Sequence, residues 1–530
     1  MAETSAHHDA ALTRRRLLAV GAGASALALT PRAPAWAVKS RLPDDLFKLG
    51  VASGDPLSDS VVLWTRLAPD PLNGGGMPDR GVPVDWEISA DEGFTKVVRR
   101  GTAHADPQLG HSVHVEVDGL RSHAWYWYRF RAGNEISRVA RTRTAPAPQD
   151  GVDRLRFAFV SCQNYPTGFY AAYHHMAQED LDLVIHLGDY IYEGAPGSSG
   201  VRRHEGTGEP LTLADYRNRH AQYRSDPDLQ DAHAAFPFSV TWDDHEIDNN
   251  WADHIPQDPD RQTPQDFRRR RMAAIRAYYE HMPLRRRSAG TGASLPLYRR
   301  FSYGTLATFN VLDGRQYRSD QSCGDPFIKL NSDCAERYDA ANTMLGSKQE
   351  RWLLGGLARS DARWNILANQ TIVAQYDYDP SAARGFNTDQ WDGYPVERRR
   401  LLDLFARGDV SNPVVITGDW HSSWVNELKQ DFDDPSARSV ATEFSGTSIS
   451  SSCGWARDVE KALGVNPHVR YFDGDRRGYV RCEVTREQWR SDFRLLPASS
   501  APGVTVPSRD VPLEKTVSWV IPSGESVQPA

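Results

Sequence analysis

Short runs of alternating apolar and polar residues fill the segment from residue 47 to residue 144, and this period of two is typical of β-strands. The clearest predicted strands cover residues 60–65, 82–88, 111–117 and 125–130. Turn-forming pairs such as Asp118-Gly119 lie between them. The pattern therefore predicts a small antiparallel β-sandwich, in a domain spanning residues 38–146.

The pattern changes after the proline-rich linker 145–151. Continuous apolar runs, typical of strands buried on both faces, now end in small or acidic residues. These runs are 156–160 before Ser161-Cys162, 183–187 before Gly188-Asp189, 238–242 before Asp243-Asp244-His245, and 414–417 before Gly418-Asp419. Helical segments separate them, so residues 152–530 are predicted to form an α/β domain, in which ligands collect beyond the carboxyl ends of the strands.

The first residues read as an export signal. Three arginines, Arg14 to Arg16, precede a modestly apolar run over 17–29, and the small-residue site Ala35-Trp36-Ala37 follows. The run is shorter than the roughly 20 residues that a bilayer span requires. We therefore expect a twin-arginine signal peptide over 1–37, with a basic tail as the alternative, no transmembrane segment, and a secreted or envelope-associated protein.

Composition excludes several classes of protein. The chain has 530 residues, of which 40% are hydrophobic and 25% charged, so it is globular. Its net charge of -7 argues against a nucleic-acid-binding module, because such proteins concentrate positive charge. The cysteines number 5, so in an oxidising compartment one of them is left without a disulfide partner inside the chain.

The strand ends supply a set of side chains that a metal cluster explains. The candidate ligands are Cys162, Asp189, Tyr192, Asp243, Asp244, Asn250, Asp419 and His421. Carboxylates gathered in a buried cleft repel one another unless a cation compensates them. Oxygen ligands favour Ca2+, Mg2+ or Mn2+, whereas a thiolate and a phenolate indicate a stronger Lewis acid such as Fe3+. Singly, each residue has a plainer explanation as a turn or a packed core side chain.

Several motifs together resemble a known family. They are Phe47 to Pro56, Ser161-Cys162-Gln163, Gly188 to Glu193, Trp242 to Glu246, Leu312 to Arg318, Asn369-Gln370 and Gly418 to His421. Across nearly the whole chain the sequence resembles the PhoD-like alkaline phosphatases of the metallophosphoesterase superfamily. The resemblance implies a metallophosphoesterase-type β-sandwich flanked by helices, preceded by a small all-β domain like those of immunoglobulins and fibronectin.

The resemblance also implies the metals and their ligands. One Fe3+ and two Ca2+ are expected, with Cys162, Asp189 and Tyr192 as iron ligands and Asp189 bridging to calcium. Asp419 and His421 are expected to be the remaining ligands near the cluster. Asp243 or Asp244, together with Asn250, is expected to bind calcium.

The cysteine count fits this assignment, because Cys162 on iron is the cysteine left over. Among the other four, we favour a Cys323–Cys334 disulfide that closes a short polar loop. Cys453 and Cys482 are then either paired or free.

Two residues are candidates for direct catalysis. His245 is expected to contact the phosphoryl group or protonate the leaving oxygen, or else to orient Asp244. Arg315 is expected to clamp phosphate with its guanidinium, or else to form an ion pair in the core.

The expected activity is hydrolysis of phosphate monoesters, and of diesters as well, by direct attack of a metal-held water or oxide. The first alternative is a calcium-dependent phospholipase D or phosphodiesterase of the same family. The second is a metal-stabilised binding protein without turnover. The expected partners are a phosphate-ester substrate and the twin-arginine export machinery, and the protein is expected to be a monomer.

Overall fold

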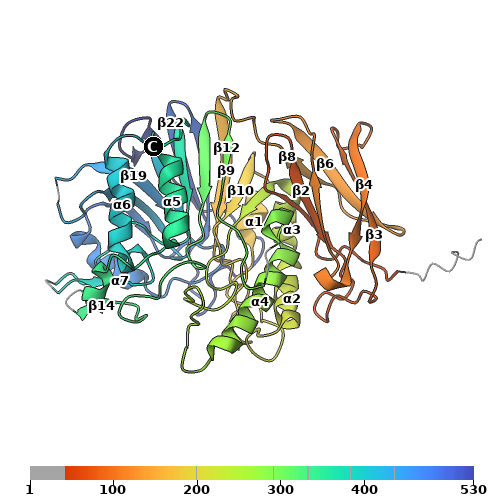
Figure 1. Ribbon diagram of the computed structural model, residues 1–530, viewed down its shortest axis with the longest axis horizontal. Coiled ribbons are helices and arrows are strands. Elements are labelled where there is room, and N and C mark those ends of the chain that lie inside the picture. The colour runs from red at the N-terminus through yellow and green to blue at the C-terminus, as the bar shows by residue number, and fades with distance from the viewer. Residues whose placement is uncertain (1–41, 198–199, 290–291, 331–332, 382, 435) are drawn as a thin grey trace, which may run out of the picture. The chain divides into compact units, whose positions relative to one another are not determined.

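Two mixed β-sheets pack face to face, and the apolar side chains between them form the central core. The computed structural model describes residues 42–530, except 198–199, 290–291, 331–332, 382 and 435. Phe157 and Ile185 contribute to this core from one sheet, and Phe309, Ile366 and Ile416 contribute from the other. Both sheets are covered on their outer faces by helices, so the layers run helix, sheet, sheet, helix (Figure 1).

The larger sheet contains the strands that were predicted before Cys162, Asp189 and Asp243. Its order is β24 (Gln528–Pro529), β23 (Lys515–Pro522), β22 (Gln488–Leu495), β21 (Gly478–Thr485), β9 (Arg154–Val160), β10 (Leu183–His186), β11 (Pro237–Val240), β1 (Val51–Gly54), β2 (Val61–Arg66) and β5 (Ser112–Val117). Strands β9, β10 and β11 are parallel neighbours, so their carboxyl ends lie at one edge.

The second sheet contains the strand that was predicted before Asp419. Its order is β12 (Arg299–Tyr303), β13 (Ala307–Val311), β15 (Trp364–Ala368), β17 (Pro413–Thr417), β19 (Ser439–Ser445), β18 (Ser423–Lys429) and β20 (Val469–Asp473). Strands β13, β15, β17 and β19 run parallel, which brings the carboxyl ends of β13, β15 and β17 to one edge as well.

Helices cover the two outer faces. They are α1 (Ala171–Met176), α2 (Leu213–Arg224), α3 (Pro227–Ala235) and α4 (Pro264–His281) on the larger sheet, and α5 (Gly346–Leu357), α6 (Pro395–Ala406) and α7 (Ala456–Ala462) on the second. Local sequence sets their starts: Thr212 and Asp215 form a capping box on α2, and Thr263 caps α4 just before Pro264. In Figure 1, α5 and α6 lie on the opposite side of the paired sheets from α2, α3 and α4.

The N-terminal segment is all-β, as predicted, but it is not a self-contained sandwich. Part of it forms a small sheet of β4 (Val97–Ala105), β3 (Val82–Ser89), β6 (Trp125–Ala132) and β7 (Glu135–Ile136), with β8 (Ala140–Arg143) paired to β6. Strands β1, β2 and β5 instead extend the larger sheet, because β1 pairs in parallel with β11 through Ser53 and Pro237.

Burial explains why these strands leave the small sheet. Every residue of β2 is buried, and the indole of Trp64 donates a 3.0 Å hydrogen bond to the carbonyl of Glu280 on α4. Such a strand needs cover on both faces. Pro43–Ala530 accordingly forms one compact unit, and the predicted boundary near residue 146 falls inside that unit.

A short two-stranded sheet, β14 (Lys329–Leu330) with β16 (Gly385–Phe386), lies beside the disulfide Cys323–Cys334. That disulfide is the predicted one and is confirmed, with a Cα–Cα distance of 5.7 Å. Cys162, Cys453 and Cys482 are free.

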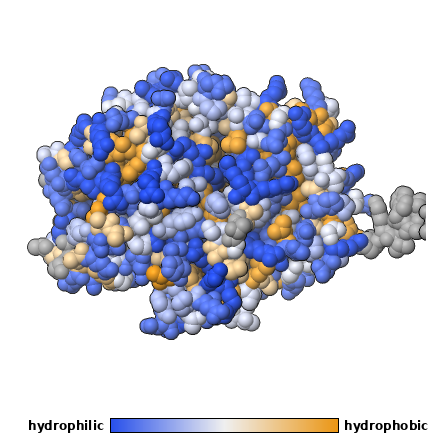
Figure 2. Space-filling model, in the orientation of Figure 1, coloured by the Kyte–Doolittle hydropathy of each residue, from blue (hydrophilic) through white to orange (hydrophobic). Residues whose placement is uncertain are grey.

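The predicted signal peptide, residues 1–37, lies outside the described residues. Within the described part of the chain, none of the helices combines the length and apolarity needed to cross a bilayer. The face shown in Figure 2 is mostly hydrophilic, with smaller apolar areas between the charged side chains.

Candidate metal centre

The carboxyl ends of strands from both sheets converge, and they bring the predicted ligands together. Cys162 follows β9, Asp189 follows β10, Asp244 follows β11, and Asp419 with His421 follows β17. Side chains from these loops form three overlapping groups in which the candidate ligand atoms lie within 4.8 Å of one another. The groups are Cys162, Asp189 and His421; Asp189, Asp244 and His245; and Asp189, Asp243, Asp244 and Asp419.

The glycine of each Gly-Asp pair allows the loops to approach closely. A Cβ atom on Gly188, whose φ is +115°, would lie 2.5 Å from the Cβ of Asp243. A Cβ atom on Gly418 would lie 2.7 Å from the Cβ of Ser161. Any larger residue would therefore push the loops apart, so the spacing of the candidate ligands depends on these two glycines.

Several candidate ligands hold a left-handed backbone conformation that is unfavourable for residues other than glycine. The φ angles are 59° at Cys162, 57° at Asp189, 58° at Asp419 and 51° at His421. Each such residue costs on the order of 1–3 kcal/mol, and strain of this kind gathers at functional sites. The fold holds these side chains in place at a cost to its own stability.

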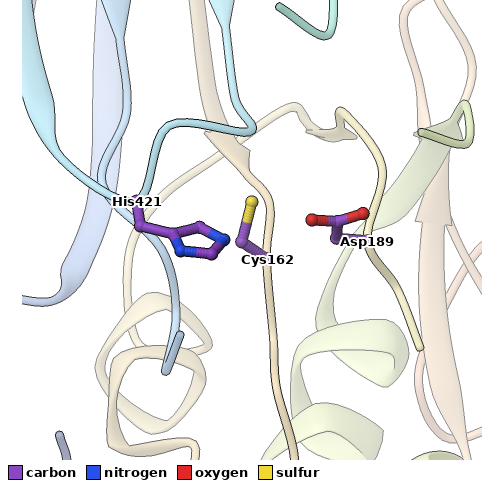
Figure 3. Close-up of side chains that lie close together, drawn as sticks. All are labelled: Cys162, Asp189 and His421. Atoms are coloured by element: carbon purple, nitrogen blue, oxygen red, sulfur yellow. The ribbon is translucent and has the colours of Figure 1, made fainter. Parts of the chain in front are cut away.

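Sulfur, oxygen and nitrogen atoms meet on one side of the centre. In Figure 3 the carboxylate of Asp189 and the imidazole of His421 approach Cys162 from opposite sides. The phenol of Tyr192 lies 2.8 Å from Oδ2 of Asp189 and 3.0 Å from Nε2 of His421. Nδ1 of His421 lies 2.8 Å from the carbonyl oxygen of Ser452, and this contact leaves Nε2 facing the group.

The electrostatics of this side disfavour charge in the absence of a cation. Burial, together with the charges of Asp189 and Asp419, raises the pKa of the Cys162 thiol well above its usual value. Burial likewise raises the pKa of Tyr192, and it lowers the pKa of His421 to about 3, so the imidazole is neutral and able to bind a metal.

Carboxylates dominate the other side. Asp189, Asp243 and Asp244 are buried and Asp419 is half-buried. Burial and the neighbouring carboxylates raise the pKa of Asp189 and of Asp419 well above the usual range, and the pKa of Asp243 rises to about 7. Among the described residues, no hydrogen-bond partner reaches Oδ2 of Asp243 or Oδ1 of Asp244, although both atoms are buried. These buried acceptors fit bound cations.

Arg315 is surrounded by carboxylates. Its side chain is fully buried, and Nε donates a 2.5 Å hydrogen bond to Oδ1 of Asp243. Its two terminal nitrogens donate to the two carboxylate oxygens of Asp389 at 2.7 and 2.9 Å. These contacts favour the core ion pair over the phosphate clamp, because the guanidinium already pairs with two carboxylates.

His245 is half-buried and is held by two neighbours. Its Nδ1 lies 2.7 Å from Oε2 of Glu193, and its ring stacks on Tyr192 with centroids 4.1 Å apart. Burial alone would lower the pKa of His245, but the carboxylates of Glu193, Asp244 and Asp189 together raise it well above its usual value. These contacts favour the protonated form of the imidazole when no cation is bound.

Two family models match the chain. The model of the PhoD-like phosphatase covers residues 157–493, and that of the PhoD-like phosphatase N-terminal domain covers residues 32–146. The chain belongs to the PhoD-like phosphatase family. The resemblance drawn from the motifs is thereby confirmed.

Two relatives agree with this assignment. The chain is 52% identical over 471 residues to alkaline phosphatase D of Bacillus subtilis (strain 168), which covers 87% of this chain and 80% of that protein. A solved structure of PhoD superposes with a TM-score of 0.86 at 50% identity, covering 91% of this chain and 92% of that chain. These matches confirm the predicted fold and favour a phosphatase over the phospholipase D and non-catalytic alternatives.

Asn250 lies at the edge of this PhoD-like centre. Its backbone N–H donates a 2.7 Å hydrogen bond to Oδ2 of Asp244. Its side-chain amide donates to Oδ2 of Asp325, also at 2.7 Å. Asp325 belongs to the loop that the Cys323–Cys334 disulfide closes, and it is not among the predicted ligands.

Four further residues, none of them a predicted ligand, support the centre. Glu246 accepts hydrogen bonds from the backbone N–H groups of Asp189, Tyr190 and Asp243, and so ties two ligand loops together. Glu193 contacts His245, and Asp389 pairs with Arg315. The side-chain nitrogen of Gln390 donates a 2.6 Å hydrogen bond to Asp419. Glu193 and Glu246 lie inside the family motifs, so their place near the site could have been predicted from the sequence. Asp389 and Gln390 lie outside these motifs, and nothing in the sequence marks them.

Proposed function

We propose that this chain is an exported phosphatase that hydrolyses phosphate monoesters, and diesters as well, at a site holding one Fe3+ and two Ca2+. The observation that carries the proposal is the pair of ligand groups sharing Asp189. One group combines a thiol, a carboxylate and an imidazole, and the other contains carboxylates alone. Donor sets this different favour two kinds of metal.

The softer group would hold iron. Cys162, Asp189 and Tyr192 supply sulfur, carboxylate and phenol ligands, and His421 lies within reach through Nε2. Asp419 lies with the acidic side chains on the other side of Asp189.

The acidic group would hold calcium. Asp243, Asp244 and Asp189 offer carboxylate oxygens, and Asn250 lies beside Asp244. When bound, metals of this kind acidify water and neutralise charge on the phosphoryl group.

His245 is the residue of this chain best placed to move a proton. Glu193 engages Nδ1, so Nε2 is the ring atom available to protonate the leaving oxygen. Glu193, which belongs to none of the ligand groups, contacts the ring directly and raises its pKa, which supports a role as proton donor. The alternative role, orientation of Asp244, stays open because His245 and Asp244 share one ligand group.

The N-terminal segment is proposed to direct export. The arginines at positions 14–16 and the apolar run after them support a twin-arginine signal, which suits a protein that receives its metals before leaving the cytoplasm. Replacing Arg15 and Arg16 by lysine should leave the protein inside the cell. Export that continues unchanged would contradict this assignment.

Elemental analysis tests the metal proposal. Protein exported by its own signal should carry iron and calcium and should release phosphate from p-nitrophenyl phosphate; bis-p-nitrophenyl phosphate then reports diester hydrolysis. Stoichiometric zinc without iron would overturn the metal assignment, and metal-loaded protein that hydrolyses neither ester would overturn the activity.

A further inference from the structure

A cluster of aromatic rings adjoins the metal centre at His421. The ring of Trp455 lies 5.3 Å from the imidazole of His421 and 5.1 Å from the ring of Trp420, measured between centroids. Phe327 stacks on Trp420 with centroids 5.8 Å apart and planes only 1° from parallel. Tyr378 completes the cluster against Phe327 and Trp420.

Part of this cluster is open to solvent. Trp420 is buried, but Phe327 is 39% exposed and Trp455 is half-buried. His421, to which the cluster connects, is half-buried as well. An apolar surface therefore begins at a predicted metal ligand and continues outward over Trp455 and Phe327.

The loop that carries Phe327 is anchored at several points. The Cys323–Cys334 disulfide closes it, and Asn387 donates a 2.8 Å hydrogen bond to the carbonyl of Phe327. Two residues before Phe327, Asp325 accepts the hydrogen bond from Asn250. The same short loop thus contacts the carboxylate side of the centre through Asn250 and the aromatic cluster through Phe327, which places Phe327 at the rim of the site.

We propose that Phe327 and Trp455 form an aromatic subsite that binds the leaving group of the substrate. It favours phosphate esters whose alcohol presents a flat ring, such as an aryl or nucleoside group. Offset stacking and apolar contact between rings supply the recognition. They are available because Phe327 is 39% exposed and contacts Trp455, which is half-buried and lies against His421. The proposal rests on the phosphatase activity proposed above and adds the substrate class.

The test compares esters with and without a ring. Phenyl phosphate and ethyl phosphate are assayed with wild-type protein and with Phe327→Ala, Phe327→Leu and Trp455→Ala. Loss of one stacking partner should lower kcat/KM for phenyl phosphate about 3- to 10-fold relative to wild type. The kcat/KM for ethyl phosphate should stay unchanged. Phe94→Ala, which removes a ring from the turn between β3 and β4, is the matched control and should affect neither ester.

Inhibition gives a second readout that does not depend on turnover of the probe. Phenylphosphonate should lose affinity in the same variants, whereas methylphosphonate should not. Phe327→Leu keeps an apolar side chain and guards against misfolding, which the thermal unfolding midpoint also reports.

The outcomes separate the two proposals. Wild-type protein that hydrolyses neither ester contradicts the proposed function. Wild-type protein that hydrolyses both, with variants that lower kcat/KM for both equally or not at all, overturns the subsite.

Discussion

The phenol of Tyr192 lies 2.8 Å from Oδ2 of Asp189, three positions earlier in the chain, and both side chains contact other parts of the centre. Tyr192 also reaches His421 and accepts a 2.8 Å hydrogen bond from Ser451. Asp189 belongs to all three ligand groups. The short Gly188-to-Tyr192 turn therefore connects the sulfur-containing side to the carboxylate side, and Asp189 is the residue common to both.

This position makes Asp189 the most informative residue to replace. Asp189→Asn keeps the size of the side chain but removes a charge that every ligand group uses. We expect phosphatase activity, iron content and calcium content to be lost together, as measured by p-nitrophenyl phosphate hydrolysis and elemental analysis. Asp118→Asn, in an exposed turn, is the matched control. Retention of both metals in Asp189→Asn would rule out the bridging role.

Replacement of Arg315 should act on stability rather than on substrate binding. Arg315→Met removes the guanidinium that pairs with the buried carboxylates of Asp243 and Asp389, and leaves Asp389 with Arg318 alone. Breaking a buried pair in this way costs about 3–5 kcal/mol in the free energy of unfolding. Denaturant unfolding of metal-loaded protein measures the loss, and Arg268→Met on the exposed face of α4 is the control. An unchanged midpoint with a raised KM would restore the phosphate-clamp role.

Most of the candidate site could be predicted because its residues follow strands with a clear pattern. A continuous apolar run that ends in Gly-Asp marks both the strand and the position of the acid, as at Asp189 and Asp419. The second carboxylate partner of Arg315 could not be predicted in this way. Asp389 lies 74 residues further along, in a segment without a strand or helix pattern, and only the folded chain brings it to the guanidinium.

In the fold, too, the strands could be predicted from the local sequence, whereas their pairing with distant strands could not. Alternation predicted the strands at 60–65 and 111–117, which correspond to β2 and β5. It did not predict their sheet, because a period of two identifies the faces of a strand and not its neighbour. The parallel pairing of β1 with β11 joins segments more than 180 residues apart through Ser53 and Pro237, and it draws β2 and β5 into the larger sheet.

Buried histidines should make the protein sensitive to acid. His220 is fully buried and stacks on His281 at 5.0 Å, and neither ring nitrogen of His220 has a hydrogen-bond partner among the described residues. Burial and the nearby charges of Arg66 and Arg224 lower its pKa to about 3. In the unfolded chain the pKa is about 6.5, so the unfolded state binds more protons between these values. Stability therefore falls as pH decreases from about 6.5.

His220→Phe tests this contribution, since it removes the titrating group and keeps a ring. The variant should reduce the pH dependence of the unfolding free energy by up to about 1.4 kcal/mol per pH unit below about pH 6.5. Urea unfolding at several pH values measures it, with His104→Phe at an exposed position as the control. Equal slopes for wild type and His220→Phe would contradict the assignment.

The stability of the metal-free protein should depend on pH in the direction opposite to the histidine effect: it should fall as pH rises. Without cations, burial raises the pKa of Asp243 to about 7 and that of Glu246 to about 8, against about 4 in the unfolded chain. At low pH these two groups are protonated and do not destabilise the fold. As pH rises through their folded-state pKa values, the buried carboxylates must ionise, and the free energy of unfolding decreases. Bound cations would compensate those charges.

The difference in unfolding midpoint between metal-loaded and chelator-treated protein should therefore widen from about pH 5 to about pH 8. Addition of Ca2+ should narrow it again, and a difference that stays constant across this range would show that the carboxylates are not compensated by metal.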